Sequence, residues 1–180
     1  MQLHNTQSRF GVVAMSLHWL TVALVLAAWL LGTFGDVFPK GPTRAAGLTV
    51  HISLGLAILA ALAVRIAWRL RDQLPLTEPT SLGVLGDKAG RAAHYALYVL
   101  LIAVPIVGIV LQFARGEPLP VFGLLQVASP WAADRTFAGS VKGIHEVLAN
   151  ALIIVAGIHA AAAIFHHWYL KDRTLERMLP

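Results

Sequence analysis

Apolar residues in this chain form four long runs separated by shorter, more polar connections. The runs lie at about residues 10–34, 45–70, 89–113 and 140–169. Each is close to or longer than the roughly 20 residues that a helix needs to cross a bilayer. The connections at 35–44, 71–88 and 114–139 contain prolines, which interrupt helices. The pattern predicts a single domain over residues 1–180, an all-α integral membrane protein with its four helices packed as a bundle.

The composition supports a membrane protein. Hydrophobic residues make up 57% of the chain and charged residues 13%, whereas soluble domains carry about 25% charged residues. The chain has no cysteine, which excludes disulfides, iron–sulfur clusters and thiol catalysis. The formal net charge is +5, but the basic residues flank the apolar runs instead of forming one patch. We therefore expect contact with membrane lipid and no binding of nucleic acid.

The basic residues near the ends of the runs predict an orientation. On one side of the membrane the pattern places Arg9, Arg65, Arg69, Arg71, Lys88, Arg91, Lys171, Arg173 and Arg177. On the other side it places Lys40, Arg44, Arg115, Arg135 and Lys142. Because loops rich in lysine and arginine tend to remain in the cytoplasm, we expect both termini there.

Histidines recur inside the apolar runs at two depths. His145 and His159 are fourteen residues apart on the last run, which brings them to within about 40° of the same helix face and separates them by roughly 21 Å. His51 shares its expected depth with His145, and His18 shares its depth with His159. A histidine inside a membrane is costly and usually marks a functional site. Two histidine pairs predict two b-type haems in the core of the bundle, with bis-histidine iron suited to electron transfer.

Other interpretations of these histidines remain open. His94 lies in the same half of the membrane as His18 and is the alternative partner of His159, although Arg91 nearby indicates a shallower position. Intramembrane histidines also form hydrogen bonds between helices or line proton paths. A single zinc site would need ligands within about 2 Å of one ion, which pairs at two depths do not provide. A histidine-lined transporter for a metal or for protons is a further alternative, and it predicts a colourless protein.

A weak internal repeat relates the two halves of the chain. His18 lies in the motif SLHWL of the first run, and His94 lies in the similar motif AAHYAL of the third. Each is followed fourteen residues later by a glycine, Gly32 and Gly108. His51, early in the second run, corresponds to His145, early in the fourth. The pattern favours two similar helical hairpins.

His166 lies at the end of the last run, seven residues after His159. That spacing is about two helical turns, so the two side chains are expected to project from nearly the same face. A histidine there can hydrogen-bond a quinone carbonyl and pass it a proton. The alternative is interfacial anchoring beside Trp168 and Tyr169.

Several stretches together carry a resemblance to a known family. They are SLHWL (16–20), FPK (38–40), VHISLG (50–55), VRIAWRL (64–70), ARGEP (114–118), SVKGIHE (140–146) and GIHAAAAIFHHWYLKDRTLERMLP (157–180). Over nearly its whole length the chain resembles the bacterial cytochrome b561 family, especially its superoxide oxidase members. The resemblance implies an inner-membrane four-helix protein that reduces quinone. It also implies that two haems are bound by His18, His51, His145 and His159.

The same resemblance implies a reaction. Superoxide would be oxidised at the periplasmic face, where we assign Lys40, Arg44, Arg115 and Lys142 to attract the anion. Electrons would reach ubiquinone on the cytoplasmic side, where we assign His166 and Lys171 to the quinone site. The alternative is a haem b subunit that transfers electrons between quinone and a partner dehydrogenase or periplasmic cytochrome. The connection at 114–139 is the candidate docking surface for such a partner.

Overall fold

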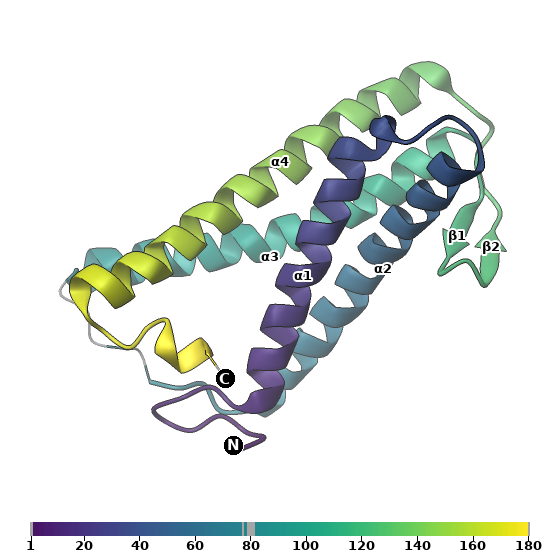
Figure 1. Ribbon diagram of the computed structural model, residues 1–180. Helices are drawn as coiled ribbons and strands as arrows, with labels where there is room; N and C mark the ends of the chain where they lie inside the picture. The colour runs from purple at the N-terminus through teal and green to yellow at the C-terminus, as the bar shows by residue number, and fades with distance from the viewer. Residues whose placement is uncertain (1, 77, 79–81, 180) are drawn as a thin grey trace.

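The computed structural model describes residues 2–76, 78 and 82–179, and it contains the four expected helices (Figure 1). They are α1 (Val12–Phe34), α2 (Pro42–Arg71), α3 (Gly83–Ala114) and α4 (Arg135–Phe165). Two short strands, β1 (Leu119–Val121) and β2 (Leu125–Val127), pair antiparallel between α3 and α4. Short turns follow α1 at Gly35–Val37 (3₁₀) and α4 at His166–Leu170 (π-helical), and a 3₁₀ turn lies at Glu176–Met178.

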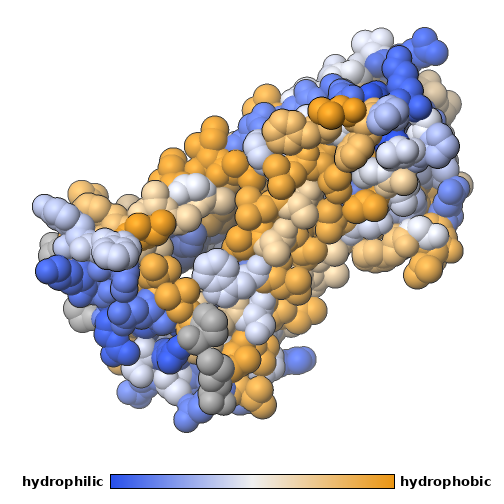
Figure 2. Space-filling model, viewed as in Figure 1, coloured by the Kyte–Doolittle hydropathy of each residue, from blue (hydrophilic) through white to orange (hydrophobic). Residues whose placement is uncertain are grey.

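The helices present apolar side chains to their surroundings. All four are long and apolar enough to cross a membrane. Large apolar side chains such as Leu26, Ile102 and Ile154 are exposed on their outer faces. Figure 2 shows this apolar surface over the middle of the molecule, with hydrophilic residues gathered at its two ends. The structure thus confirms the predicted class, an all-α membrane protein of four helices.

The helices pack as two antiparallel hairpins that form a V. α1 packs along α2, α3 packs along α4, and α2 contacts α3, whereas α1 and α4 touch only briefly. In Figure 1 the hairpins lie close together at the end that carries β1 and β2 and diverge toward the termini. We call the closed end, with residues 35–41 and 115–134, the hairpin face. We call the open end, with residues 2–11, 72–76 and 171–179, the terminal face.

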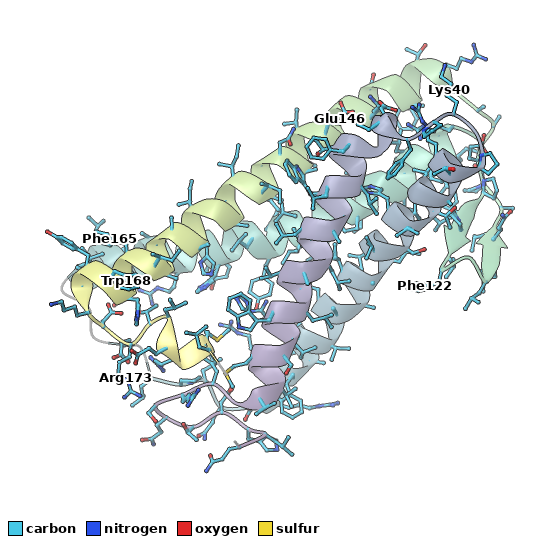
Figure 3. The ribbon with its side chains drawn as sticks, in the orientation of Figure 1. Lys40, Phe122, Glu146, Phe165, Trp168 and Arg173 are labelled. Carbon is cyan, nitrogen blue, oxygen red and sulfur yellow. The ribbon has the colours of Figure 1, made fainter. Side chains whose placement is uncertain are left out.

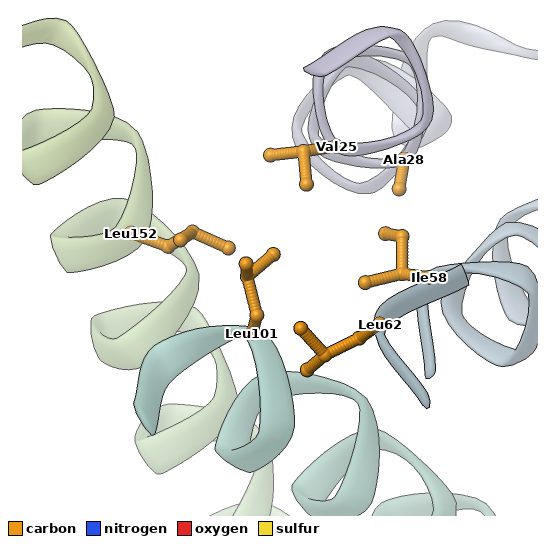
Figure 4. Packing of buried hydrophobic residues seen from close by; sticks show 6 residues of the cluster. All are labelled: Val25, Ala28, Ile58, Leu62, Leu101 and Leu152. Carbon is orange, nitrogen blue, oxygen red and sulfur yellow. The ribbon is translucent and has the colours of Figure 1, made fainter. Parts of the chain in front are cut away.

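A small apolar cluster joins all four helices halfway along the bundle. Its buried members are Val25, Ala28, Ile58, Leu62, Leu101 and Leu152 (Figure 4). Leu62 is the most enclosed, with 2% of its surface exposed. Because lipid is as apolar as these side chains, the cluster stabilises the bundle through close packing and not through exclusion of water. In sequence it lies between the two depths at which the histidines occur, so it separates them.

Short polar contacts tie the N-terminal segment to the end of α2. The Asn5 backbone N–H donates to Asp72 Oδ2 at 2.9 Å. The side chains of Asn5 and Gln73 each donate to the other's backbone carbonyl at 2.8 Å. The Asn5 N–H also lowers the pKa of Asp72, since it stabilises the carboxylate form. These bonds hold the ends of α1 and α2 together at the terminal face.

The segment after α4 crosses the open end of the V and reaches α1 (Figure 1). Arg9 Nη2 donates to the Leu179 carbonyl at 2.7 Å, and Trp19 Nε1 donates to the Met178 carbonyl at 2.8 Å. Both acceptors are main-chain oxygens. The C-terminal segment, residues 171–179, therefore links the α3–α4 hairpin to the α1–α2 hairpin where the helices themselves diverge.

Two details differ from the sequence-based expectation. The third helix begins at Gly83, before the expected residue 89, and the fourth begins at Arg135, before the expected residue 140. The β-hairpin was not predicted, because the segment was expected to be an irregular connection. Its turn residues Phe122 and Gly123 both have positive φ, 53° and 69°, and the Leu124 N–H donates to the Val121 carbonyl at 3.0 Å, as in a type I′ turn.

Candidate functional site

His51 on α2 and His145 on α4 face each other near the hairpin face; we call them the hairpin-side pair. Their ring centroids are 6.2 Å apart and the ring planes are inclined by 82°. One metal ion bound between two imidazoles, with bonds of about 2 Å on each side, separates the ring centroids by roughly 6 Å. The spacing of this pair therefore suits two imidazoles that bind one ion.

Backbone carbonyls fix the orientation of both rings. His51 Nδ1 lies 2.8 Å from the Ala28 carbonyl oxygen, and His145 Nδ1 lies 3.1 Å from the Val104 carbonyl oxygen. A carbonyl oxygen only accepts, so each Nδ1 must carry the proton and donate it. The lone pair of a neutral ring is then on Nε2, the atom free to bind metal. A hydrogen bond of this kind is the usual support for a metal-ligating histidine.

Two glycines leave room for these rings. A Cβ atom at Gly32 would lie 2.9 Å from His51 Cε1, and one at Gly108 would lie 3.1 Å from His145 Cε1. A side chain at either position would push the histidine out of place. These are the two glycines of the sequence repeat, so the repeat reflects the same packing requirement in both hairpins.

A cavity of 610 Å³ opens beside the hairpin-side pair. Both histidines and both glycines line it, and it extends inward to Ile58 of the apolar cluster. Its walls come from all four helices. A volume in this range is typical of sites for small molecules and cofactors.

Charged residues surround the hairpin-face end of this cavity. Arg44, Arg115 and Lys142 line it, while Lys40 is exposed on the same face outside the lining (Figure 3). Arg44 pairs with Asp36 at 3.1 Å, and Lys142 pairs with Glu146 at 2.8 Å. Within the described residues Arg115 has no carboxylate partner. The structure thus brings three of the four predicted cations together, and Arg115 is the one whose charge is not offset.

His18 on α1 and His159 on α4 face each other nearer the terminal face; we call them the terminal-side pair. Their ring centroids are 6.5 Å apart, with planes inclined by 72°. This spacing also suits two ligands on one ion. His94 on α3 lies closer to His159, at 5.1 Å. The structure therefore places both candidate partners of His159 beside it.

Arg65 of α2 forms a hydrogen bond with a ring nitrogen of His18. Its Nη2 lies 3.2 Å from His18 Nδ1. A guanidinium only donates, so His18 Nδ1 accepts and the proton of a neutral ring is on Nε2. This is the reverse of the arrangement at the hairpin-side pair. Sequence reasoning missed Arg65 because a basic residue near a helix end reads as an interfacial anchor.

His166 begins the π-helical turn after α4, and its side chain faces Asp172. Its Nδ1 lies 2.6 Å from Asp172 Oδ2. Burial alone would raise the pKa of Asp172, but hydrogen bonds from Thr174 and His166 outweigh burial and hold the pKa below its ordinary value of 3.8. Lys171 is exposed, in a left-handed conformation with φ 53°. The structure places Lys171 near His166 in the chain without a described contact between the two side chains.

Paired histidines at two depths of an apolar four-helix bundle are the arrangement expected of a membrane cytochrome of the b type, which carries electrons on haem. Comparison with known proteins agrees. A family model described as prokaryotic cytochrome b561 matches residues 9–180. The chain belongs to this family, and so it is a multi-pass bacterial membrane protein of oxidoreductase type whose family cofactor is haem b.

Individual relatives match over nearly their full length. The chain is 34% identical to a protein of Yersinia pestis named probable superoxide oxidase CybB, over 96% of each chain. It is 33% identical to cytochrome b561 homolog 2 of Escherichia coli, over 99% of this chain and 95% of the relative. It is 30% identical to cytochrome b561 homolog 1 of the same organism, over 96% and 98%.

Proposed function

We propose that this chain is a superoxide:ubiquinone oxidoreductase of the bacterial inner membrane. The observation that carries the proposal is the hairpin-side pair, aligned by two carbonyls beside a cavity with a basic mouth. The name of the Yersinia pestis relative supports the donor. In this proposal the hairpin face is periplasmic and both termini are cytoplasmic, as the distribution of basic residues indicates.

Two haem b groups fit the residues present. His51 and His145 would hold one, and His18 and His159 the other. When bound, haem iron supplies one-electron transfer. At the hairpin-side pair the protein holds the ring centroids 6.2 Å apart, sets both tautomers through backbone carbonyls and, through Gly32, leaves the volume that the His51 ring needs.

The basic mouth would act on the donor. Superoxide is a small anion, and a funnel of positive charge raises its local concentration and its rate of arrival. Arg115 has the largest expected effect, because Asp36 and Glu146 offset the charges of Arg44 and Lys142. Lys40 lies outside the cavity lining and should contribute least of the four.

The other end of the molecule would act on the acceptor. Two superoxide anions, one ubiquinone and two protons give two dioxygen molecules and one ubiquinol. His166 would hold a proton for a quinone oxygen, and Asp172, at 2.6 Å, would orient its ring. Lys171 would offer a second donor to the quinone at the same face.

The proposal is tested by mixing purified protein with superoxide in a stopped-flow spectrometer, with superoxide dismutase as the control. We expect reduced b-haem bands to grow quickly and the dismutase to abolish them. Arg115→Gln should slow the reaction several-fold and weaken its dependence on salt, whereas Arg91→Gln, exposed near the terminal face, should not.

Two other results would contradict the proposal. Haem bands that do not respond to superoxide would favour the electron-transfer subunit, whose partner would then dock near residues 114–139. A colourless protein would contradict both haem functions and favour a transporter.

A further inference from the structure

Two arginines of α2 lie beside the terminal-side pair without a carboxylate partner. The guanidinium carbons of Arg65 and Arg69 lie 5.9 Å and 6.0 Å from the ring centroid of Tyr98 on α3. Neither forms an ion pair among the residues that the structure describes. Arg65 Nη2 also lies 3.2 Å from His18 Nδ1.

Two cations on one aromatic ring repel each other, and the surroundings make this costly. Arg65 is half-buried and lies within a membrane-spanning helix, where low polarity strengthens the repulsion. The ring of Tyr98 offsets part of it through cation–π attraction. An unpaired charge at such a position is a marker of a functional site. An anion beside the two guanidiniums would neutralise both charges.

We propose that Arg65 and Arg69 form a carboxylate clamp that holds the propionates of the haem bound by the terminal-side pair. This inference rests on the proposed function, which places a haem there. Haem b carries two carboxylates, and each cationic side chain can hold one of them through charge-assisted hydrogen bonds. Tyr98 keeps both guanidiniums on the same side of the bundle, so one anionic edge can meet both.

The clamp also explains the contact between Arg65 and His18. With Arg65 Nη2 at 3.2 Å from His18 Nδ1, the proton of the neutral ring is on Nε2, and that nitrogen cannot bind iron. A carboxylate is a stronger partner for Arg65, because both groups of the new hydrogen bond are charged. Moving Arg65 to a propionate therefore frees His18 to shift its proton to Nδ1 and present Nε2. The hairpin-side pair needs no such step, since its tautomers are already set by carbonyls.

The test measures haem content and midpoint potentials, and it does not depend on activity. Haem per chain is determined for the wild type and for the double variant Arg65→Gln/Arg69→Gln. His159→Ala and His145→Ala give the spectrum of each haem alone. We expect the double variant to bind half as much haem as the wild type, with the spectrum of His159→Ala. Arg71→Gln, an exposed residue at the end of the same helix, should keep both haems.

The double variant Arg65→Lys/Arg69→Lys distinguishes an effect of lost charge from an effect of misfolding. It keeps both positive charges and should retain both haems. The clamp is overturned if the glutamine variant keeps both haems at unchanged potentials, or if the lysine variant loses the terminal-side haem as well. If the glutamine variant loses both haems, the lysine variant decides between the explanations. A lysine variant that retains both haems supports the clamp, and a lysine variant that loses either haem contradicts it. A wild type with two haems and an unaffected glutamine variant would leave the proposed function standing. A wild-type protein without haem would contradict both the clamp and the proposed function.

Discussion

At the scale of single residues, the two histidines of the hairpin-side pair are positioned in the same way from different hairpins. In each case a carbonyl accepts from Nδ1, and the residue four positions later in that helix is the glycine that the ring packs against. Ala28 and Gly32 serve His51, and Val104 and Gly108 serve His145. Position and tautomer are therefore set by the facing helix of the same hairpin.

Gly32→Val should displace His51 and empty the hairpin-side haem site. The added Cβ would lie 2.9 Å from His51 Cε1, closer than packed atoms allow, and valine adds further bulk. We expect the haem content to fall by about half, as measured by absorbance of the purified protein. Gly143→Ala is the matched control on α4, because its Cβ meets nothing within 4 Å; it should keep both haems. Equal haem loss in both variants would contradict this explanation.

Asp172→Asn should remove a pH-dependent part of the stability of the terminal face. The pKa of Asp172 is lowered in the folded protein, so its carboxylate stabilises the fold above the ordinary value of 3.8, and this stabilisation is lost as the pH falls through the lower, folded value. The wild type should therefore melt a few degrees higher than the variant at pH 6, and the gap should shrink toward pH 3. Differential scanning fluorimetry in detergent measures both. A gap of the same size at both pH values would contradict this role.

The pairing of histidines was accessible from the sequence, but their surroundings were not. The rise per residue of a helix gives the depth in the membrane of positions such as 145 and 159, and histidines at the same depth are expected to pair. The structure puts His94 and His18 both beside His159, so depth could not separate these two. The contact of Arg65 with His18 and that of His166 with Asp172 depend on side-chain rotamers and on how hairpins cross, which no spacing along one helix encodes.

At the scale of elements, the β-hairpin has an apolar tip. β1 packs against α2 and α3, and in Figure 1 the strands turn back beside the first turns of α2. Phe122 lies at the tip (Figure 3), and Leu124 next to it is 88% exposed. An exposed apolar tip that turns back along a membrane-spanning helix is placed to contact the lipid interface.

A fluorescent label at Leu124 should therefore report a lipid environment. The chain has no native cysteine, so Leu124→Cys gives a single site for a polarity-sensitive dye in lipid vesicles. We expect blue-shifted emission and quenching by spin-labelled lipids. Lys40→Cys, exposed on the same face, should give the emission of a dye in water. Water-like emission from position 124 would mean that the tip stands clear of the membrane.

The four helices could be predicted because long apolar runs are the strongest signal in a sequence. Their ends could not, since α3 continues through polar residues such as Asp87 and Lys88 that lie outside the apolar run. The β-hairpin was missed because its strands have three residues each, and a phenylalanine before the turn glycine is an unusual residue at a position with positive φ.

At the scale of the whole molecule, the C-terminal segment closes the V that the helices leave open. Its bonds run from Arg9 and Trp19 to main-chain carbonyls, and Arg177 adds a 3.2 Å ion pair with Glu78 in the connection between α2 and α3. The segment therefore ties both hairpins together on the side of the terminal-side pair.

Removing residues 173–180 should loosen the terminal face and lower the melting temperature. Four hydrogen bonds that link this segment to Arg9, Trp19, Leu76 and Glu78 would be lost, worth about 1 kcal/mol each. We expect the terminal-side haem to be lost or weakly held, while the hairpin-side haem stays, as shown by comparison with the spectrum of His159→Ala.

Met178→Ala/Leu179→Ala is the control for this truncation. It keeps the two carbonyls that accept from Trp19 and Arg9, so it should behave like the wild type. If this variant lost as much stability as the truncated chain, the side chains and not the main-chain bonds would hold the segment.

The order in which the ribosome makes the chain has a consequence for quality control. Each facing pair joins a residue of the first hairpin to α4, which is synthesised after the other three helices. A polypeptide that stops before α4 has neither pair, and one that stops within α4 between His145 and His159 has only one. In the proposed function, incomplete products lack the histidine pairs that would retain haem, so occupancy by haem would mark a chain whose synthesis and insertion have reached the fourth helix.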